Sequence, residues 1–396
     1  MSLAPLRRTD LTAVLGCVSL LLVGWASLLV PSLIRSIELD FGQTDAGIGV
    51  FFFVNSIAYV GGSLGGGFLT ERFGRRIVLS FAVVLIAGGL VGLATVPSWE
   101  LFLAAAIPFG LGGGAIDGGT NGLILDLYPT SRGRALNLLH LFFSLGALAS
   151  PLVVGRLVEA GVPWQGVVLG TAVASITIAI LLAITDLPSG RHARPAGTPA
   201  ARIGWAWPIV ALAVAIACYV GSEVGVSNWL VRFLETATLG LATSALALFW
   251  GCLALGRLAS ARWSDRFDHA RFAAIAALAS AAALVAAVLV PSLPASIVLF
   301  GAVGFAFGPI YPLIMAVGGD LYPARSAAVS GFLSGFAVIG AILYPPVMGF
   351  VSVGAGLGAA MVGAAALALS CGVILLLVGR TRSEQVVGAR ASEARA

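Results

Sequence analysis

Apolar segments long enough to cross a membrane recur along the whole chain. A helix of about 20 apolar residues spans the ~30 Å hydrocarbon core of a bilayer. We identify twelve such segments: Leu11 to Leu33, Ala46 to Leu69, Ile77 to Val96, Leu101 to Ile124, Ala135 to Leu157, Trp164 to Ile184, Trp205 to Leu230, Ala242 to Ala261, Phe272 to Val290, Ala295 to Val317, Ala327 to Phe350 and Leu357 to Val378. Hydrophobic residues make up 59% of the chain and charged residues only 10%, a composition that soluble domains do not have. The sequence predicts an all-α, multi-pass membrane protein.

The basic residues of the chain are all arginines, and their distribution predicts how the chain crosses the bilayer. If the N-terminus is cytoplasmic, only Arg35, Arg156 and Arg232 fall on or near the outer side, and the others lie inside. Cytoplasmic loops of membrane proteins carry such an excess of positive charge. We therefore expect both termini on the cytoplasmic side of the cell membrane, inner or plasma. The net charge of +5 reflects topology and the lipid bilayer, and we expect no nucleic-acid partner.

The sequence contains no pattern typical of a metal, a cofactor or an enzyme. The four cysteines lie in apolar segments without a C-x-x-C pair or a histidine at ligand spacing, so we interpret them as small core residues: Cys17, Cys218, Cys252 and Cys371. There is no metal cluster, nucleophile–base pair or phosphate-binding loop. We expect no cofactor, no metal and no enzyme activity.

A polar segment, Asp186 to Gly204, divides the apolar segments into six and six, and the two halves repeat each other. The offset is 194 residues: Asp126-Leu127-Tyr128-Pro129 recurs as Asp320-Leu321-Tyr322-Pro323, and Gly62, Gly110, Gly114 and Gly146 recur as Gly256, Gly304, Gly308 and Gly340. We predict an N-terminal half (1–185), a cytoplasmic linker (186–204), a C-terminal half (205–380) and a cytoplasmic tail (381–396).

The even number of segments in each half predicts the symmetry and the class of protein. Both copies enter the membrane in the same direction, so we expect a pseudo-two-fold axis along the membrane normal. That arrangement is typical of secondary transporters, in which a substrate site near the midplane is exposed alternately to the two sides. We expect the protein to act as a monomer.

Asp117 is the first candidate for a functional residue, because it interrupts the glycine-rich apolar segment Ile107 to Leu125. An ionisable side chain at that depth costs several kcal/mol unless it faces a wet cavity or a partner. Thr120 and Asn121 follow on the same helix face. We predict that Asp117 couples transport to an ion and that Asn121 binds the substrate. The alternative is a protonated Asp117 that only packs against a neighbouring helix.

Glu223 is the corresponding candidate in the second half, with Tyr219 and Ser227 four residues away on the same face. No basic residue lies close in sequence to neutralise it, which favours a coupling role. Asn228 and Trp229 follow as candidate substrate ligands. Trp229 could stack on a sugar ring or lie in the interfacial aromatic belt.

Weaker candidates line the predicted cavity. His140 could relay protons or bind a sugar hydroxyl, although a single histidine in a helix bundle is as often structural. The further substrate-binding candidates are Asn55, Trp25, Trp250 and Tyr311, the last of which is the 194-residue counterpart of Asp117.

The loop between the second and third segments carries a glycine, an acid–arginine pair, a second glycine and a basic pair. The residues are Gly67, Glu71, Arg72, Gly74, Arg75 and Arg76. This pattern resembles the signature of the major facilitator superfamily. The resemblance implies a cytoplasmic gate, in which Gly67 permits close helix approach and the charges hold one side shut; Asp126 and Arg134 belong to it, with a weaker copy at Asp265 and Arg266. These arginines could instead be topology markers alone.

A narrower resemblance covers residues from about Gly67 to Gly349. Three stretches are similar to the fucose-permease-like sugar porters, the fucose/galactose/glucose:proton symporter group: Gly114 to Asn121, Gly133 to Phe143 and Tyr219 to Trp229. Phe305 to Pro312 in the tenth segment extends the likeness. It implies uptake of a sugar coupled to a proton or to sodium, with Asp117 as the coupling residue. We therefore predict a proton-coupled sugar symporter. The alternatives are a drug:proton antiporter of the same fold and a non-transporting membrane receptor or scaffold.

Overall fold

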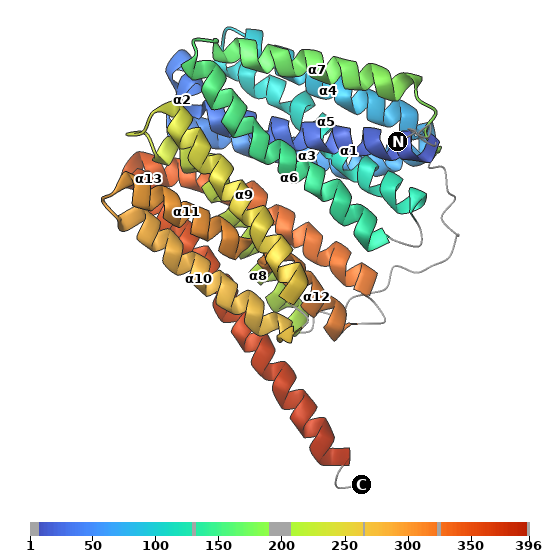
Figure 1. Ribbon diagram of the computed structural model, residues 1–396, viewed down its shortest axis with the longest axis vertical. Coiled ribbons are helices and arrows are strands. Elements are labelled where there is room, and N and C mark those ends of the chain that lie inside the picture. Colours follow the sequence, from blue (N-terminus) through green and yellow to red (C-terminus); the bar gives the residue numbers. More distant parts are fainter. Residues whose placement is uncertain (1–7, 129–131, 190–206, 264–265, 323–325, 394–396) are drawn as a thin grey trace, which may run out of the picture. The chain divides into compact units, whose positions relative to one another are not determined.

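The computed structural model of the protein describes residues 8–128, 132–189, 207–263, 266–322 and 326–393, and they are helical almost throughout. The helices, labelled in Figure 1, are α1 (Arg8–Ser27), α2 (Leu29–Phe41), α3 (Asp45–Phe73), α4 (Arg75–Thr95), α5 (Trp99–Leu127), α6 (Arg132–Glu159), α7 (Trp164–Ile184), α8 (Trp207–Phe233), α9 (Leu239–Trp263), α10 (His269–Leu289), α11 (Leu293–Phe307), α12 (Ile310–Leu321) and α13 (Ser326–Glu393).

Eleven stretches of the described residues are long and apolar enough to cross a membrane. Helices α1 and α2 form one of them, and so do α11 and α12, which are separated by Gly308 and Pro309. The last stretch covers 52 residues, Val329–Arg380, and contains Gly356 with φ 79° and ψ 157°. A positive φ of this kind is readily adopted only by glycine, and it separates the last two predicted segments. The all-α membrane fold predicted from the sequence is confirmed.

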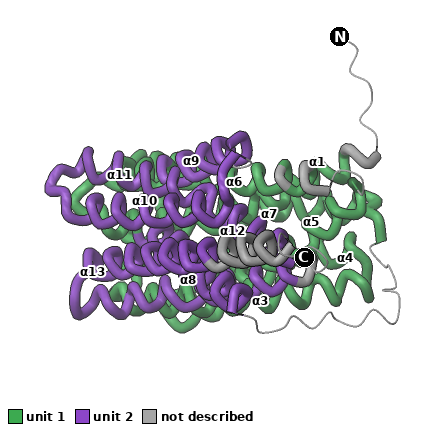
Figure 2. The backbone as a smooth tube through the Cα atoms, turned by 90° about the horizontal axis from the view of Figure 1, so that it is seen from below, with its two compact units in different colours: residues 1–197, 230–247 green, residues 198–229, 248–396 purple. Residues whose placement is uncertain are grey.

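The chain forms two compact units (Figure 2). Unit 1 contains residues 1–197 and 230–247, and unit 2 contains residues 198–229 and 248–396. The end of α8 and the start of α9 therefore belong to unit 1, although the repeat in the sequence assigns them to the second half. We call residues 230–247 the α8–α9 corner.

Glycines set the close packing of α5 in unit 1, as the sequence predicts. A Cβ on Gly110 would lie 2.5 Å from the carbonyl oxygen of Asn55, and one on Gly114 would overlap the carbonyl oxygen of Tyr59. No residue with a side chain fits such an approach of two helix backbones without displacing one of them. These two glycines therefore fix the register of α5 against α3.

The 194-residue repeat is also present in the structure. Helices α3, α4, α5 and α6 begin at Asp45, Arg75, Trp99 and Arg132, and α9, α10, α11 and α13 begin 194 residues later, at Leu239, His269, Leu293 and Ser326. The glycine contacts recur as well. Gly304 and Gly308 in unit 2 approach the carbonyl groups of Phe249 and Leu253, as Gly110 and Gly114 approach those of Asn55 and Tyr59 in unit 1. The two halves thus share one internal packing scheme.

Candidate functional site

Asp117 lies in the middle of α5 and is bonded to the next polar residue on its helix face. The Nδ2 group of Asn121 donates to Asp117 Oδ1 at 3.1 Å and to the Asp117 carbonyl oxygen at 2.9 Å. Thr120 is fully buried and donates to the Ile116 carbonyl oxygen at 2.7 Å. Asn121 is therefore positioned to hold one oxygen of the Asp117 carboxyl group, while Thr120 has a structural role.

Two further helices bring polar side chains to Asp117. Tyr59 of α3 forms a side-chain hydrogen bond with the carboxyl group, and His140 of α6 interacts with it electrostatically. The structure thus places Asp117, Asn121, His140 and Tyr59 in one group, which we call the Asp117 cluster. Three of its members are predicted from the sequence. Tyr59 is not, because only the tertiary packing of α3 on α5 brings it there.

Asn55 lies one helical turn before Tyr59 on α3. Its Oδ1 atom is buried and has no hydrogen-bond partner among the described residues. Asn55 and Tyr59 line a small cavity of about 20 Å³ in unit 1, together with Ser27 and Phe109. That volume holds about one water molecule, and an unpaired carbonyl oxygen is a suitable acceptor for it. Trp25 is less available, because its Nε1 donates to Thr171 Oγ1 at 3.1 Å.

Glu223 is buried in unit 2 with 8% of its surface exposed. The hydroxyl group of Tyr219 donates to its carboxyl group, as the shared helix face suggests. No basic residue lies close to Glu223 in the sequence, but in the structure the guanidinium of Arg257 on α9 interacts with it electrostatically. Arg257 is 34 residues away in the sequence. A signal was available: an arginine inside a predicted membrane segment is itself a candidate functional residue.

The aromatic candidates of unit 2 differ in their surroundings. Trp229 is completely buried, and its Nε1 donates to the Pro345 carbonyl oxygen at 2.9 Å. Trp229 therefore packs in the core of unit 2 in this structure. Trp250 donates to Ser227 Oγ at 2.9 Å, and the Tyr311 hydroxyl lies 3.3 Å from Ser334 Oγ. Asn228 is half-buried on α8.

The predicted gate contains one well-defined ion pair. Arg75 Nη2 lies 2.6 Å from Asp126 Oδ2 and joins the start of α4 to the end of α5. Gly74 separates α3 from α4 with φ 87°, a conformation that favours glycine. The backbone conformation between α3 and α4 therefore explains why the signature has a glycine at position 74.

The remaining residues of the gate signature are less constrained. Glu71, Arg72 and Arg76 are exposed, and Arg72 lies over the Phe73 ring at 5.4 Å. The predicted close helix approach at Gly67 is wrong for this structure, since a Cβ there would meet nothing within 4 Å.

The second copy of the gate is only partly described. Asp265 lies outside the described residues, as does the side chain of Arg134, and Arg266 is exposed. The counterpart of the Arg75–Asp126 pair is nevertheless clear, because His269 Nδ1 lies 3.4 Å from Asp320 Oδ2.

Comparison with known proteins identifies the family. The chain matches the Major Facilitator Superfamily in two overlapping stretches, residues 14–249 and 203–395. It belongs to this family. Curated relatives include protein TsgA of Salmonella schwarzengrund, 26% identical over 315 residues that cover 78% of this chain and 77% of TsgA. A TsgA homolog of Citrobacter koseri is 25% identical over the same share of each chain.

Solved structures of transporters share the fold of this major facilitator protein. A bacterial homolog of the human lysosomal transporter Spinster, inward-facing and unoccupied, has a TM-score of 0.78 at 16% identity over 96% of this chain and 98% of that one. The nucleoside transporter NupG gives 0.73 at 12% identity over 94% and 100%. The E. coli fucose:proton symporter FucP gives 0.62 at 20% identity over 94% and 99%. The family and the fold are those of transporters.

Proposed function

We propose that this transporter moves a small polar solute, a sugar, together with a proton, and that Asp117 carries the proton. The observation that carries the proposal is the Asp117 cluster, in which a carboxyl group on a membrane-spanning helix is surrounded by an amide, a phenol and an imidazole from three helices. These are groups that hydrogen-bond both a carboxyl group and the hydroxyl groups of a sugar.

The chemistry of burial provides the coupling. A charged carboxylate is costly in a cavity that closes around a solute, whereas a protonated carboxyl group avoids most of that cost. Protonation of Asp117 would therefore favour closure with the solute inside. His140 could supply or accept the proton, because an imidazole exchanges protons near neutral pH. The fold supports alternating access, and we place both termini in the cytoplasm.

Glu223 and Arg257 suggest that the two halves have different roles in transport. Their opposite charges compensate each other in unit 2, whereas the Asp117 cluster contains no arginine or lysine. A neighbouring guanidinium favours the charged form of a carboxyl group, and the Asp117 cluster supplies none to the Asp117 carboxyl group. We therefore assign proton coupling to Asp117 and solute binding to Glu223 and Tyr219.

The proposal is tested with purified protein in two steps. A ligand that binds only the folded protein raises its apparent melting temperature, so the protein is screened with fucose, galactose, glucose, uridine and tetraphenylphosphonium. Uptake of the stabilising compound is then measured in proteoliposomes under an inward proton gradient, with a sodium gradient as the control. We expect stabilisation by a sugar and proton-driven uptake. Stabilisation by the lipophilic cation alone would favour a drug antiporter. Uptake driven only by sodium would refute proton coupling.

A further inference from the structure

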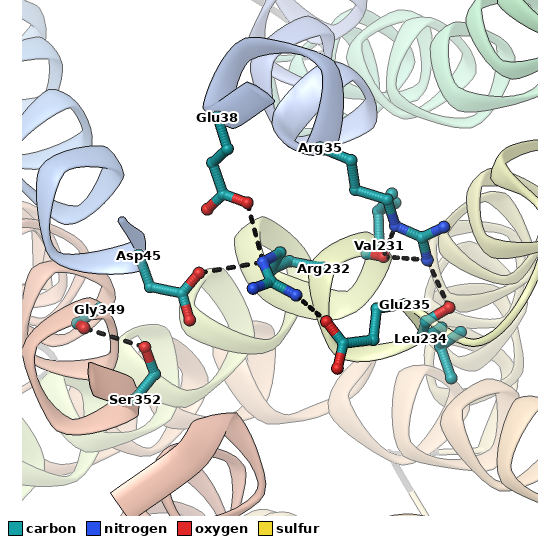
Figure 3. A network of polar contacts seen from close by, with 9 residues as sticks. All are labelled: Arg35, Glu38, Asp45, Val231, Arg232, Leu234, Glu235, Gly349 and Ser352. Atoms are coloured by element: carbon teal, nitrogen blue, oxygen red, sulfur yellow. Dashed lines mark hydrogen bonds and ion pairs between the residues drawn. The ribbon is translucent and has the colours of Figure 1, made fainter. Parts of the chain in front are cut away.

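A cluster of five charged side chains in unit 1 is not used by the proposed transport mechanism (Figure 3). It contains Arg35 and Glu38 of α2, Asp45 of α3, Arg232 of α8 and Glu235 of the turn that follows. We call it the Arg232 cluster. It lies at the opposite end of α3 from Gly74 and the Arg75–Asp126 pair, the end that the arginine distribution places outside.

The side chain of Arg35 binds backbone carbonyl groups at the end of α8. Its guanidinium donates to the carbonyl oxygens of Val231, at 2.6 and 2.9 Å, of Ala237, at 2.8 Å, and of Leu234. The last carbonyl groups of a helix have no partner within it, and a cation there satisfies them and complements the helix dipole. Arg35 therefore fastens the α8–α9 corner to α2 independently of any acid.

Two further contacts attach the same corner to α6. The Gly240 amide donates to Glu159 Oε1 at 2.6 Å. A Cβ on Gly155 would overlap the Thr243 side chain, and Thr243 is completely buried. The corner belongs to the second repeat by sequence but is bound to α2, α3 and α6. These contacts agree with the assignment of the corner to unit 1.

Two carboxyl groups of the Arg232 cluster share one N–H donor. Glu38 Oε2 lies 2.8 Å and Asp45 Oδ1 lies 3.0 Å from the same Nε atom of Arg232. That atom has a single hydrogen, which cannot bond fully to both. Both carboxyl groups are only 12% exposed, and Glu38 Oε1 is buried without a hydrogen-bond partner among the described residues.

The neighbouring charged groups do not provide Glu38 and Asp45 with a second cation. Arg35 is used by backbone carbonyls, and Glu235 is a third acid bonded to Arg232. Asp40 accepts from Trp164 and Gln165, and Glu159 accepts from the Gly240 amide. Two guanidinium groups thus face three carboxyl groups, and the cluster becomes neutral when one carboxyl group is protonated. A proton on Glu38 or Asp45 would also allow a hydrogen bond between the two groups in place of repulsion.

We propose that Glu38 and Asp45 together form a proton-binding site, and that the bound proton stabilises the attachment of the α8–α9 corner through Arg232. Loss of the proton leaves two carboxylates on one N–H group and weakens the attachment. The site would thus act as an outer gate that acid closes and alkali loosens. The proposal rests on the proposed function only in assuming that the attachment of the corner to α2 and α3 loosens during transport.

The test measures opening of the corner without measuring transport. A single cysteine replaces Thr243 in a chain whose four native cysteines are serines, and its reaction with a maleimide is followed in detergent at acidic and alkaline pH. Leu39→Cys provides the reference at each pH, because Leu39 is 83% exposed and corrects for the ionisation of the thiol itself. We expect the normalised rate to be low in acid and to rise with pH.

Substitutions in the Arg232 cluster separate the proton site from a simple ion pair. Arg232→Ala should raise the normalised rate about tenfold in acid, which corresponds to ~1.4 kcal/mol, and by less at alkaline pH, where the attachment in the parent is already weakened. Glu38→Gln and Asp45→Asn imitate the protonated acid and should abolish the pH dependence, with labelling slow throughout. Glu235→Gln, the matched control in the same cluster, should retain it. Should Arg232→Ala fail to fold, the two amide variants still decide.

Two results would overturn the proposal. Labelling that is equally slow in Arg232→Ala and in the parent would show that the cluster does not hold the corner. A pH dependence that survives in both Glu38→Gln and Asp45→Asn would show that these acids do not hold the proton. Failure of sugar uptake would refute the proposed function but leave this measurement valid, because no solute takes part in it.

Discussion

Arg75 Nη2 lies 2.6 Å from Asp126 Oδ2, and this ion pair joins the start of α4 to the end of α5. The same contact recurs 194 residues later between His269 and Asp320, which join α10 to α12 at 3.4 Å. The two pairs differ in chemistry. The Arg75 side chain is 7% exposed and always charged, whereas His269 is 23% exposed and is charged only when protonated.

We predict that Asp126→Asn destabilises the protein more than Asp320→Asn does. Removing Asp126 leaves a buried guanidinium without its carboxylate, at a cost of about 1 to 3 kcal/mol. The lower part of that range is expected because Asp126 is 39% exposed. The His269–Asp320 contact is longer, at 3.4 Å, and joins side chains that are 23% and 41% exposed, so Asp320→Asn should cost less. Thermal unfolding of the purified variants measures both effects.

The matched pair of variants makes this prediction specific. Equal destabilisation by the two substitutions would contradict it. The control is His269→Arg, which restores the first-half pair in the second half and should raise the cost of Asp320→Asn towards that of Asp126→Asn.

A second prediction concerns the glycines of the repeat. Gly114→Ala places a methyl group on the carbonyl oxygen of Tyr59, and overpacking of this kind costs about 1 to 3 kcal/mol. Gly308→Ala should have a similar effect, because its Cβ would lie 2.5 Å from the Leu253 carbonyl oxygen. Gly67→Ala is the control, since nothing lies within 4 Å of a Cβ there. Thermal unfolding should rank Gly67→Ala at or above the parent and the other two below it.

The sequence predicts the fold well because the signals that specify it are local. Each membrane segment is recognised by its own length and apolar composition, and the break at Gly356 falls between the last two predicted segments. The repeat also predicts which positions of the two halves correspond. Gly110 and Gly304 are counterparts in the sequence, and in the structure both pack against a backbone carbonyl group of a neighbouring helix. The assignment of residues 230–247 to unit 1 could not be predicted, because it depends on contacts such as Arg232 with Asp45 between distant segments.

The site is less predictable than the fold, and the reason is tertiary. Asn121 bonds to Asp117 one helical turn away, so helical periodicity suffices to pair them. Tyr59 and Arg257 reach Asp117 and Glu223 from other helices, and no spacing in the sequence reveals those contacts. Trp229 shows the opposite limitation, because its residue type suggests an exposed role while its helix face is buried.

A third prediction tests the topology that the arginines indicate. Leu39 is exposed on α2, and the segment from Arg35 to Asp45 is predicted to face outward, so Leu39→Cys reports on the outer side. Gly197→Cys lies in the predicted cytoplasmic linker, outside the described residues. In intact cells an impermeant maleimide should label Leu39→Cys and not Gly197→Cys, and permeabilised cells should show labelling of both. Labelling of Gly197→Cys in intact cells would reverse the assignment.

The last prediction concerns Asp117, because its protonation is the step that couples solute to proton. Asp117→Asn imitates the protonated acid permanently and retains an acceptor oxygen for the Asn121 amide, which donates to Asp117 Oδ1 at 3.1 Å. Closure around the solute should therefore remain possible, while release of a proton does not. We expect solute exchange in the absence of a gradient to persist in proteoliposomes and accumulation driven by a pH gradient to disappear. The matched control is Asn121→Ala, which removes a partner of the carboxyl group but keeps the titrating acid. It should weaken solute binding and leave some proton-driven accumulation. Accumulation by Asp117→Asn at the parent level would transfer the coupling role to Glu223 or His140, or to an ion other than the proton.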